Sequence, residues 1–501
     1  MLAENQGHVP DILDCIANLS SDEVFTPPHV ANQVLDLLPK KIWSDPNIKI
    51  LDPCCKTGIF LREAAKRLMN GLETVFPDEG ERREHIFKNM LHGIPITQLT
   101  ALVSRRSLYY TKEADNEFSI VKFENPDGNI KYRRMEHEYV QGKCNICGSP
   151  YEHLERGDSM ENYAYQFIHD QEVLQMKFDV IIGNPPYQLN DDGFGASATP
   201  IYQLFVEQAF RMKPRYVSMI IPSRWFAGGK GLNSFREKML ESKNFRSLVD
   251  YLDASEVFNG VTIKGGVCYF LWDKNYDGKC LIKTINNGVE SEALERYLGD
   301  EGDIFIRHNS ALPILEKIRE FSLDNMETMV SNQRPFGLRT NFKDFESKSF
   351  KNSIKLYTND GVKYIKKSQV LTNIDWVNKW KVITPMAAGT GEYPNIILGT
   401  PIVSEPDSCC TETYLVVGTF DNQVEAENCA LYLSTKFARF MVALRKNTQH
   451  VTSARFRFVP KLDFTKKYTD EILYDKFGIT KDEVDFINTI VREMIYPVKG
   501  K

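Results

Sequence analysis

The segment FDVIIGNPPYQ (residues 178–188) joins a typical buried strand to a rigid, polar corner. Five residues suited to a strand lead into Gly183, and Asn184, two prolines and Tyr187 follow directly. Because Asn and Pro are common in turns, a tight loop is the simplest interpretation. The alternative is that the Asn184 amide, the carbonyl of Pro185 and the ring of Tyr187 are presented to a substrate.

The chain around this corner alternates strand-like and helix-like patterns, from residue 24 to about residue 272. We expect strands at 48–52, 91–96, 178–182, 216–222 and 265–273, and helices at 59–72, 97–110 and 200–212. Repeated strand–helix units predict a parallel, doubly wound α/β sheet that is covered by helices. Ligands of such sheets bind at the carboxyl ends of the strands, where LDPCCKTGIF (51–60) and GNPPYQ (183–188) both lie.

Length and composition set broad limits on the protein. The chain has 501 residues, and we expect two domains, at 1–300 and 301–501, because the strand–helix alternation fades near residue 300. The net charge is −5, so a surface for nucleic acid would have to be local. The start of the chain does not have the pattern of a secretory signal, and the apolar runs are shorter than the roughly 18–20 residues of a membrane span. We therefore expect a cytoplasmic, nucleoid-associated protein with reduced thiols and no membrane contact.

Residues 112–157 interrupt the strand–helix alternation. We expect a hairpin around NPDGN (125–129), followed by a Cys-x2-Cys pair, Cys144 and Cys147. This spacing is typical of zinc knuckles, and His137 and His153 are near enough in sequence to complete four ligands. A Cys-x2-Cys pair also occurs in thiol redox sites, and the simplest alternative is two ordinary thiols in a loop.

Residues 431–467 contain nine Lys and Arg residues but a single acidic residue, Asp463. Four phenylalanines, at 437, 440, 456 and 458, interleave with the basic residues, as in a surface that contacts phosphates and stacks on bases. A solvated charged face is the alternative. We predict contact with double-stranded DNA through Lys436, Arg439, Arg445, Lys446, Arg455 and Arg457.

The corner at Asn184 suits chemistry on an exocyclic amine of a base. The amine of adenine is a poor nucleophile, and two acceptors, the Asn184 side-chain oxygen and the Pro185 carbonyl, can hold and polarise its N–H groups. Two consecutive prolines stiffen the loop, so these acceptors need no rearrangement in the transition state. Tyr187 offers a stacking face for a base that is taken out of the duplex.

At these residues the sequence resembles the gamma-class adenine-N6 DNA methyltransferases of bacterial restriction–modification systems, of the NPPY type found in type II and IIG enzymes. The segments that carry the resemblance follow the gamma order and cover most of the chain: VFTPPHVANQVLDLL (24–38, motif X), LDPCCKTGIFL (51–61, motif I), RGDSM (156–160, motif III), IIGNPPYQ (181–188, motif IV) and VFNGVTIKGGVCYFLW (257–272, motif VIII).

The resemblance implies a Rossmann-like class I methyltransferase sheet over residues 1–300, and a C-terminal α+β target-recognition domain over 301–501. It implies S-adenosylmethionine as cofactor, held by Thr26, Pro27, Asp52, Cys54, Gly58, Phe60 and Asp158. It also implies catalysis by Asn184, Pro185, Pro186 and Tyr187, with Tyr187 and Phe258 holding a flipped adenine. The chain has no recognisable nuclease or Walker motif, so we expect cleavage to belong to a separate restriction endonuclease or helicase subunit.

Two residues depart from the family pattern. Lys56 stands where motif I usually has glycine, either as a solvated side chain or as one that narrows the pocket. Pro95 stands where an acid is expected to bind the ribose hydroxyls. These departures keep open a DNA-binding specificity or scaffold subunit with a decayed cofactor pocket. A second alternative is a protein or RNA methyltransferase, because some of those enzymes also carry NPPY.

Overall fold

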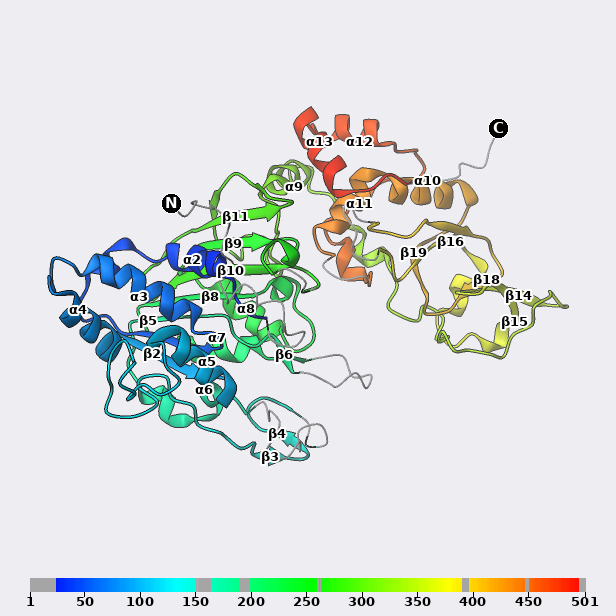
Figure 1. Cartoon of the computed structure of the whole chain (residues 1–501). Coiled ribbons are helices and arrows are strands. Elements are labelled where there is room, and N and C mark those ends of the chain that lie inside the picture. Colours follow the sequence, from blue (N-terminus) through cyan, green and yellow to red (C-terminus); the bar gives the residue numbers. More distant parts are fainter. Residues whose placement is uncertain are drawn as a thin grey trace, which may run out of the picture. The chain divides into compact units, whose positions relative to one another are not determined.

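The structure is a computed structural model that describes residues 24–149, 151, 164–189, 199–258, 261, 263–389, 396–446 and 450–494. The chain divides into two compact units (Figure 1). The first ends at Phe305 and the second begins at Ile306, five residues beyond the boundary that we placed from the sequence. None of the helices in the described ranges is long and apolar enough to cross a membrane.

A nine-stranded sheet forms the centre of the first unit. Its order is β12-β11-β9-β10-β8-β5-β1-β2, and β13 pairs with β11. The bounds are β1 Ile50–Cys55, β2 Leu91–Pro95, β5 Val180–Gly183, β8 Tyr216–Pro222, β9 Phe245–Tyr251, β10 Val267–Asp273, β11 Cys280–Asn286, β12 Val289–Glu290 and β13 Leu294–Arg296. The strands β2, β1, β5 and β8 are parallel, so β1 and β5 end at the same edge of the sheet.

The predicted parallel arrangement holds for β2, β1, β5 and β8, but the sheet as a whole is mixed. Strand β10 lies between β8 and β9 and is antiparallel to both. Two parallel neighbours need a long crossover connection, usually a helix. The helix α8 (Asn233–Glu241) precedes β9, whereas the described part of the connection from β9 to β10 contains only a short 3-10 helix, Ala254–Glu256.

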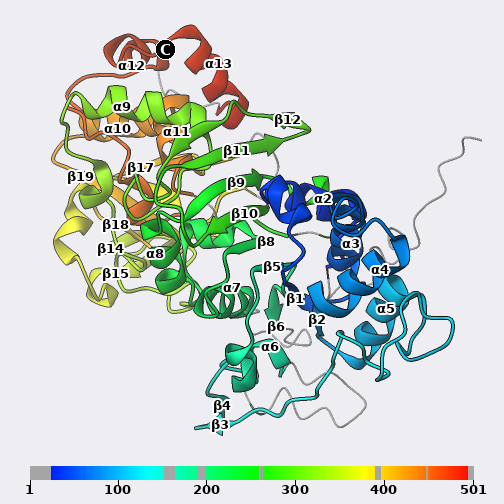
Figure 2. The ribbon, with the colours of Figure 1, turned by 90° about the vertical axis from the view of Figure 1, so that its left-hand side faces the viewer.

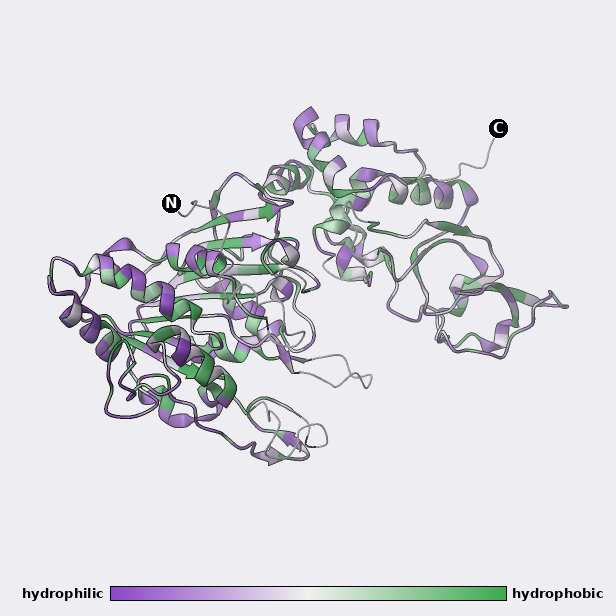
Figure 3. Cartoon of the chain, in the orientation of Figure 1, coloured by the Kyte–Doolittle hydropathy of each residue, from purple (hydrophilic) through white to green (hydrophobic). Residues whose placement is uncertain are grey.

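Alternate residues of the central strands face two separate hydrophobic cores. Val180 and Ile182 of β5 pack with residues of α2 (Pro28–Asp36) and α3 (Ile59–Gly71), whereas Ile181 packs with residues of α7 (Tyr202–Arg211) and α8. Figure 2 shows α2 and α3 on one side of the sheet and α7 and α8 on the other. The outer helix α4 (Glu79–His85) is hydrophilic over its length (Figure 3). The unit is therefore a three-layer α/β fold.

The helix α5 (Gln98–Tyr109) begins where the sequence predicts. The side chain of Thr97 accepts a hydrogen bond from the Thr100 backbone N–H, and the side chain of Thr100 accepts one from the Thr97 backbone N–H. This capping box satisfies two N–H groups that a helix start leaves unpaired. The short helix α6 (Gln166–His169) lies between the insertion and β5.

The inserted residues 112–157 contain little regular structure in their described part. The hairpin predicted at 125–129 is wrong: these residues form turns, and Ile130 makes a single bridge to Gly93 of β2. A small hairpin follows, formed by β3 (Tyr139–Val140) and β4 (Lys143–Cys144).

The second unit has two three-stranded sheets, with order β15-β14-β18 and β17-β16-β19; of its described α-helices, one precedes the sheets in the chain and the others follow them. The strand bounds are β14 Ser353–Thr358, β15 Gly361–Lys366, β16 Trp380–Pro385, β17 Ile402–Ser404, β18 Ser408–Cys410 and β19 Tyr414–Phe420. The helices are α9 Leu312–Arg319, α10 Gln423–Ser434, α11 Lys436–Ala443, α12 Asp470–Lys476 and α13 Lys481–Ile490.

Candidate active site

The side chain of Asn184 lies buried at the carboxyl end of β5. Its Nδ2 donates to the carbonyl of Val24 and to Oγ1 of Thr26, both at 3.0 Å. A backbone carbonyl only accepts hydrogen bonds, so this contact fixes which end of the amide is the nitrogen. The Oδ1 atom is then left buried, and it has no hydrogen-bond donor at normal geometry among the described residues.

The second donor to the Val24 carbonyl is Lys56. Its Nζ lies 2.9 Å from that oxygen, and the side chain is only 7% exposed. The interpretation of Lys56 as a solvated side chain is therefore wrong. Lys56 and Asn184 share one acceptor, which joins the loop after β1, the segment before α2 and the end of β5.

Two glycines near Asn184 and Lys56 allow the backbone to pass close to neighbouring residues. A Cβ atom at Gly183 would lie 2.9 Å from Oδ1 of Asp52 and 3.0 Å from Sγ of Cys54. Gly58 has φ +73°, and a Cβ there would lie 3.0 Å from the Ser104 carbonyl oxygen. Only glycine combines this close approach with a left-handed backbone at low cost.

Asp52 is a buried acid within β1, three residues before the strand ends. Burial raises its pKa to about 7, opposed by a hydrogen bond from the Cys54 backbone N–H at 3.1 Å and by the charge of Lys56. It lines a narrow pocket together with Thr26, Cys54, Lys56, Thr57, Gly58, Ile59, Phe60 and Asn184.

This pocket brings together five of the seven residues predicted to hold the cofactor: Thr26, Asp52, Cys54, Gly58 and Phe60. Pro27 is instead the N-cap of α2, and Asp158 lies outside the described residues. Sequence reasoning treated Lys56 only as a departure from a pattern, and it did not include Thr57 and Ile59. Their position within motif I is the signal that would have found them.

Tyr187 and Phe258, predicted to hold a base, lie next to one another. Their ring centroids are 6.4 Å apart with an interplanar angle of 65°. Phe258 is buried, and Tyr187 packs against the cores on both faces of the sheet. Burial raises the pKa of Tyr187 well above its ordinary value, and the neighbouring Asn184 side chain opposes that rise. The phenol is therefore neutral and close to the amide.

In the insertion, His137, Cys144 and Cys147 converge as the sequence predicts. The fourth member of the group is His169, at the end of α6, which sequence reasoning missed. His153 lies outside the described residues.

The predicted DNA-contact surface in residues 431–467 is wrong for two arginines, which are buried. Arg439 and Arg445 are 2% and 3% exposed. Arg439 donates to the carbonyls of Ser434, Thr435 and Arg492, and Arg445 donates to that of Ala454. Three of the four interleaved phenylalanines, at 437, 440 and 456, are also buried.

The other basic residues of the run are more accessible. Arg457 is exposed and pairs with Glu327 at 2.8 Å, and Lys436 donates to Asn488 at 2.6 Å. Lys446 donates to the Ala388 carbonyl at 2.8 Å, and Arg455 donates to that of Arg445. Burial and the charge of Arg455 lower the pKa of Lys446 to about 8.

Comparison with known proteins places this site in a family. The family described as Eco57I restriction-modification methylase matches residues 89–258, which include the Asn184 corner. An uncharacterized adenine-specific methylase of Mycoplasma pneumoniae is 39% identical over 308 residues, covering 55% of this chain and 72% of that protein. The chain belongs to the adenine-specific methylases. It is a methylase of the restriction–modification type, and the Asn184 corner lies within the region that matches the Eco57I family.

Solved structures similar to this methylase include restriction–modification enzymes. The Type IIL enzyme MmeI in complex with DNA has a TM-score of 0.45 at 11% identity, covering 86% of this chain and 64% of that one. A type I methyltransferase subunit from Streptococcus thermophilus has a TM-score of 0.35 at 14% identity, covering 65% and 61%. The chain thus spans less than two thirds of the length of either structure.

Proposed function

We propose that the chain methylates the N6 amine of adenine in double-stranded DNA, with S-adenosylmethionine as methyl donor. The observation that carries the proposal is the Oδ1 atom of Asn184, a buried acceptor at the end of a central strand for which the described residues provide no donor at normal geometry. A buried acceptor left unpaired has a free-energy cost, and a ligand that donates a hydrogen bond to it would offset that cost. An exocyclic amine is a donor of the right kind.

The residues of this chain would act mainly by position. Oδ1 of Asn184 would accept one hydrogen of the amine, and the carbonyl of Pro185 would accept the other, so electron density on the nitrogen would rise as it forms a fourth bond, to the methyl carbon, while the methyl–sulfur bond of the donor breaks. One N–H proton would then leave to solvent, which restores a neutral amine. Because Val24 and Thr26 already hold Nδ2, the acceptor needs no reorganisation. Tyr187 and Phe258 would hold the base by stacking and edge contacts.

The donor set around Asp52 fits S-adenosylmethionine, which supplies an activated methyl group when bound. The carboxyl group of Asp52 offers an acceptor for the amino group of the cofactor, and Gly58 lines the same pocket. We assign cofactor contacts to Thr26, Asp52, Cys54, Gly58 and Phe60, and also to Pro27 and Asp158. The order of the strands in the first unit is compatible with a Rossmann-like class I methyltransferase sheet.

The second unit is assigned to target recognition in this proposal, because it follows the catalytic unit and carries accessible basic residues such as Arg457. A separate restriction endonuclease or helicase subunit would supply any cleavage.

The proposal is tested with the purified full chain, methyl-labelled S-adenosylmethionine and unmethylated plasmid DNA. We expect label in DNA as N6-methyladenine, identified by mass spectrometry of the nucleosides. Asn184→Ala should lower the rate by about a hundredfold or more, as removal of one preorganised transition-state contact does. Asn89→Ala, which changes an exposed asparagine in the same unit, is the matched control and should keep the rate.

Three outcomes would contradict the proposal. Label in RNA or in protein, with none in DNA, would show a different substrate. An unchanged rate in Asn184→Ala would show a different site. DNA binding without any methylation would favour a specificity or scaffold subunit.

A further inference from the structure

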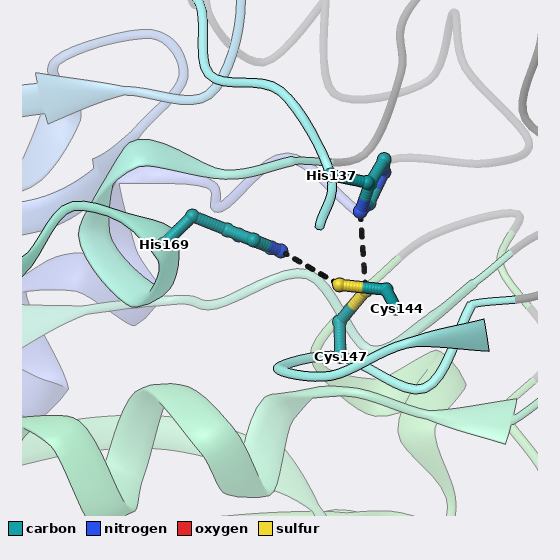
Figure 4. A group of neighbouring side chains, drawn as sticks. All are labelled: His137, Cys144, Cys147 and His169. Atoms are coloured by element: carbon teal, nitrogen blue, oxygen red, sulfur yellow. Dashed lines mark hydrogen bonds between the residues drawn. The ribbon is translucent and has the colours of Figure 1, made fainter. Parts of the chain in front are cut away.

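Four side chains converge at one point of the insertion, away from the methylation site. They are His137 before β3, Cys144 in β4, Cys147 in the following loop and His169 at the end of α6 (Figure 4). Each offers one ligand atom, and all four atoms lie within 4.8 Å of one another. Both cysteines and His169 are buried.

The distances in this group match those around a tetrahedral zinc ion. Sγ of Cys144 lies 3.7 Å from Nε2 of His169, and Sγ of Cys147 lies 3.6 Å from Nδ1 of His137. With Zn–S of about 2.3 Å and Zn–N of about 2.0–2.1 Å, a tetrahedral angle separates sulfur from nitrogen by about 3.6 Å. Both sulfur–nitrogen pairs thus have the spacing of two ligands on one ion, and all four ligand atoms lie within 4.8 Å of one another.

The surrounding backbone holds these ligands in place. The N–H of Ile146 points at Sγ of Cys144 at 3.4 Å, and the N–H of Gly148 donates to the Cys144 carbonyl at 3.0 Å. Gly148, which closes this turn, has a left-handed backbone with φ +73°. Backbone N–H groups aimed at sulfur stabilise the thiolate, the form that binds metal.

The orientation of His169 is also that of a ligand. Its Nδ1 lies 3.0 Å from the Tyr165 carbonyl, which can only accept, so Nδ1 carries the proton. Its Nε2 then keeps a lone pair, and this is the atom that faces Cys144. A ligating histidine commonly donates its other ring N–H to a carbonyl in this way.

We propose that the methylase binds one structural zinc ion through His137, Cys144, Cys147 and His169. Four protein ligands fill the coordination sphere, which is typical of a structural ion and leaves no position for a substrate. Binding releases the two thiol protons to solvent.

The ion would fasten a segment that has little core of its own. The strands of its hairpin are two residues long, and a hairpin of that size is not stable alone. His169, by contrast, belongs to α6, where Phe167 stacks on Phe205 of α7 with centroids 5.8 Å apart. Coordination by His169 therefore anchors the insertion to the core of the catalytic unit.

The test measures the metal content of the full chain purified without chelator, and then the absorption spectrum after cobalt replaces the bound ion. We expect about one zinc ion per chain, and cobalt bands of a tetrahedral site with thiolate ligands. His169→Ala should lose most of the zinc. His153→Ala is the matched control and should keep it, because the four-ligand group is already complete without it.

Two results would overturn the proposal: wild-type chain with less than about a tenth of an equivalent of zinc and no cobalt spectrum, or loss of zinc in His153→Ala with retention in His169→Ala. If His169→Ala fails to fold, measurements on the wild-type chain alone test the proposal. Chelation should lower its midpoint of thermal unfolding while S-adenosylmethionine binding at low temperature persists, and an unchanged midpoint would contradict the role of the ion.

Discussion

The buried carboxyl group of Asp52 links the stability of the chain to pH. Its pKa rises to about 7 because burial disfavours the charged form more than the Cys54 N–H and Lys56 favour it. The folded state therefore binds the proton of Asp52 more tightly than the unfolded state, where the pKa is 3.8. The contribution of this group to the free energy of unfolding is greatest below about pH 4 and falls as the pH rises to about 7.

We predict that Asp52→Asn separates stability from cofactor binding. The variant loses the cost of charging a buried acid, so relative to wild type it gains up to a few kcal/mol of unfolding free energy at pH 8, and much less at pH 4. Urea unfolding at the two pH values measures this difference. Titration calorimetry should show weaker binding of S-adenosylmethionine. A difference in stability that is the same at both pH values would contradict the argument.

At the residue scale, the sequence pointed to candidate catalytic and cofactor-binding residues, but it did not predict the contacts that hold them in place. Asn184, Tyr187 and Asp52 stand out because of their residue types and their place after strands. The partner that orients Asn184 is the backbone carbonyl of Val24, and a carbonyl has no signature in a sequence. His169 was missed for a related reason, since it lies 22 residues beyond Cys147 and only the folded chain brings it close.

At the scale of elements, one carbonyl connects three parts of the site. Val24 accepts from Lys56 in the β1–α3 loop and from Asn184 at the end of β5, and Thr26 gives Asn184 a second contact. Lys56 thus occupies the glycine position of motif I with a side chain that lies in the interior, where its hydrogen bond offsets part of the cost of burying its charge.

We predict that Lys56→Met weakens this connection while it keeps most of the side-chain volume. The free energy of unfolding should fall by about 1–3 kcal/mol, the range for a lost hydrogen bond to a charged group. The methylation rate should also fall, because the support of Asn184 loosens. Lys41→Met, at an exposed position, is the control and should change neither quantity. Equal stability of the two variants would show that the Lys56 contact is dispensable.

The elements themselves were predictable where their apolar pattern is continuous. The strands β1, β2, β5, β8 and β10 and the helices α3, α5 and α7 were expected close to their observed bounds. The strands β9 and β11 were not expected, since Arg246 and Ser247 interrupt the apolar pattern of β9 and Lys283 that of β11. Strand direction depends on how the connections cross the sheet, so the antiparallel β10 did not follow from local pattern.

At the scale of the whole molecule, the number of basic residues in a stretch of sequence did not predict which of them are exposed. In residues 431–467 the same residue types serve two purposes. Arg439 holds three backbone carbonyls inside the second unit, whereas Arg457 is exposed beside Glu327. Periodicity does not separate these cases, because a buried guanidinium is stabilised by carbonyls that leave no trace in composition.

We predict that, in the full chain, substituting Arg457 weakens DNA binding with little effect on stability, whereas substituting Arg439 lowers stability without changing the salt dependence of DNA binding. Arg457→Gln should weaken binding to plasmid DNA and reduce the slope of log K against log salt by about one, with an unfolding midpoint close to wild type, because an exposed ion pair contributes little. Arg439→Met should lower the stability by about 3 kcal/mol, since three carbonyls lose their donor, and at a temperature where the variant stays folded its salt slope should match wild type. Binding titrations at several salt concentrations, together with thermal unfolding, measure both quantities. A reduced slope in Arg439→Met with unchanged stability would place that arginine on the DNA, and an unchanged slope in Arg457→Gln would remove Arg457 from the DNA-binding surface.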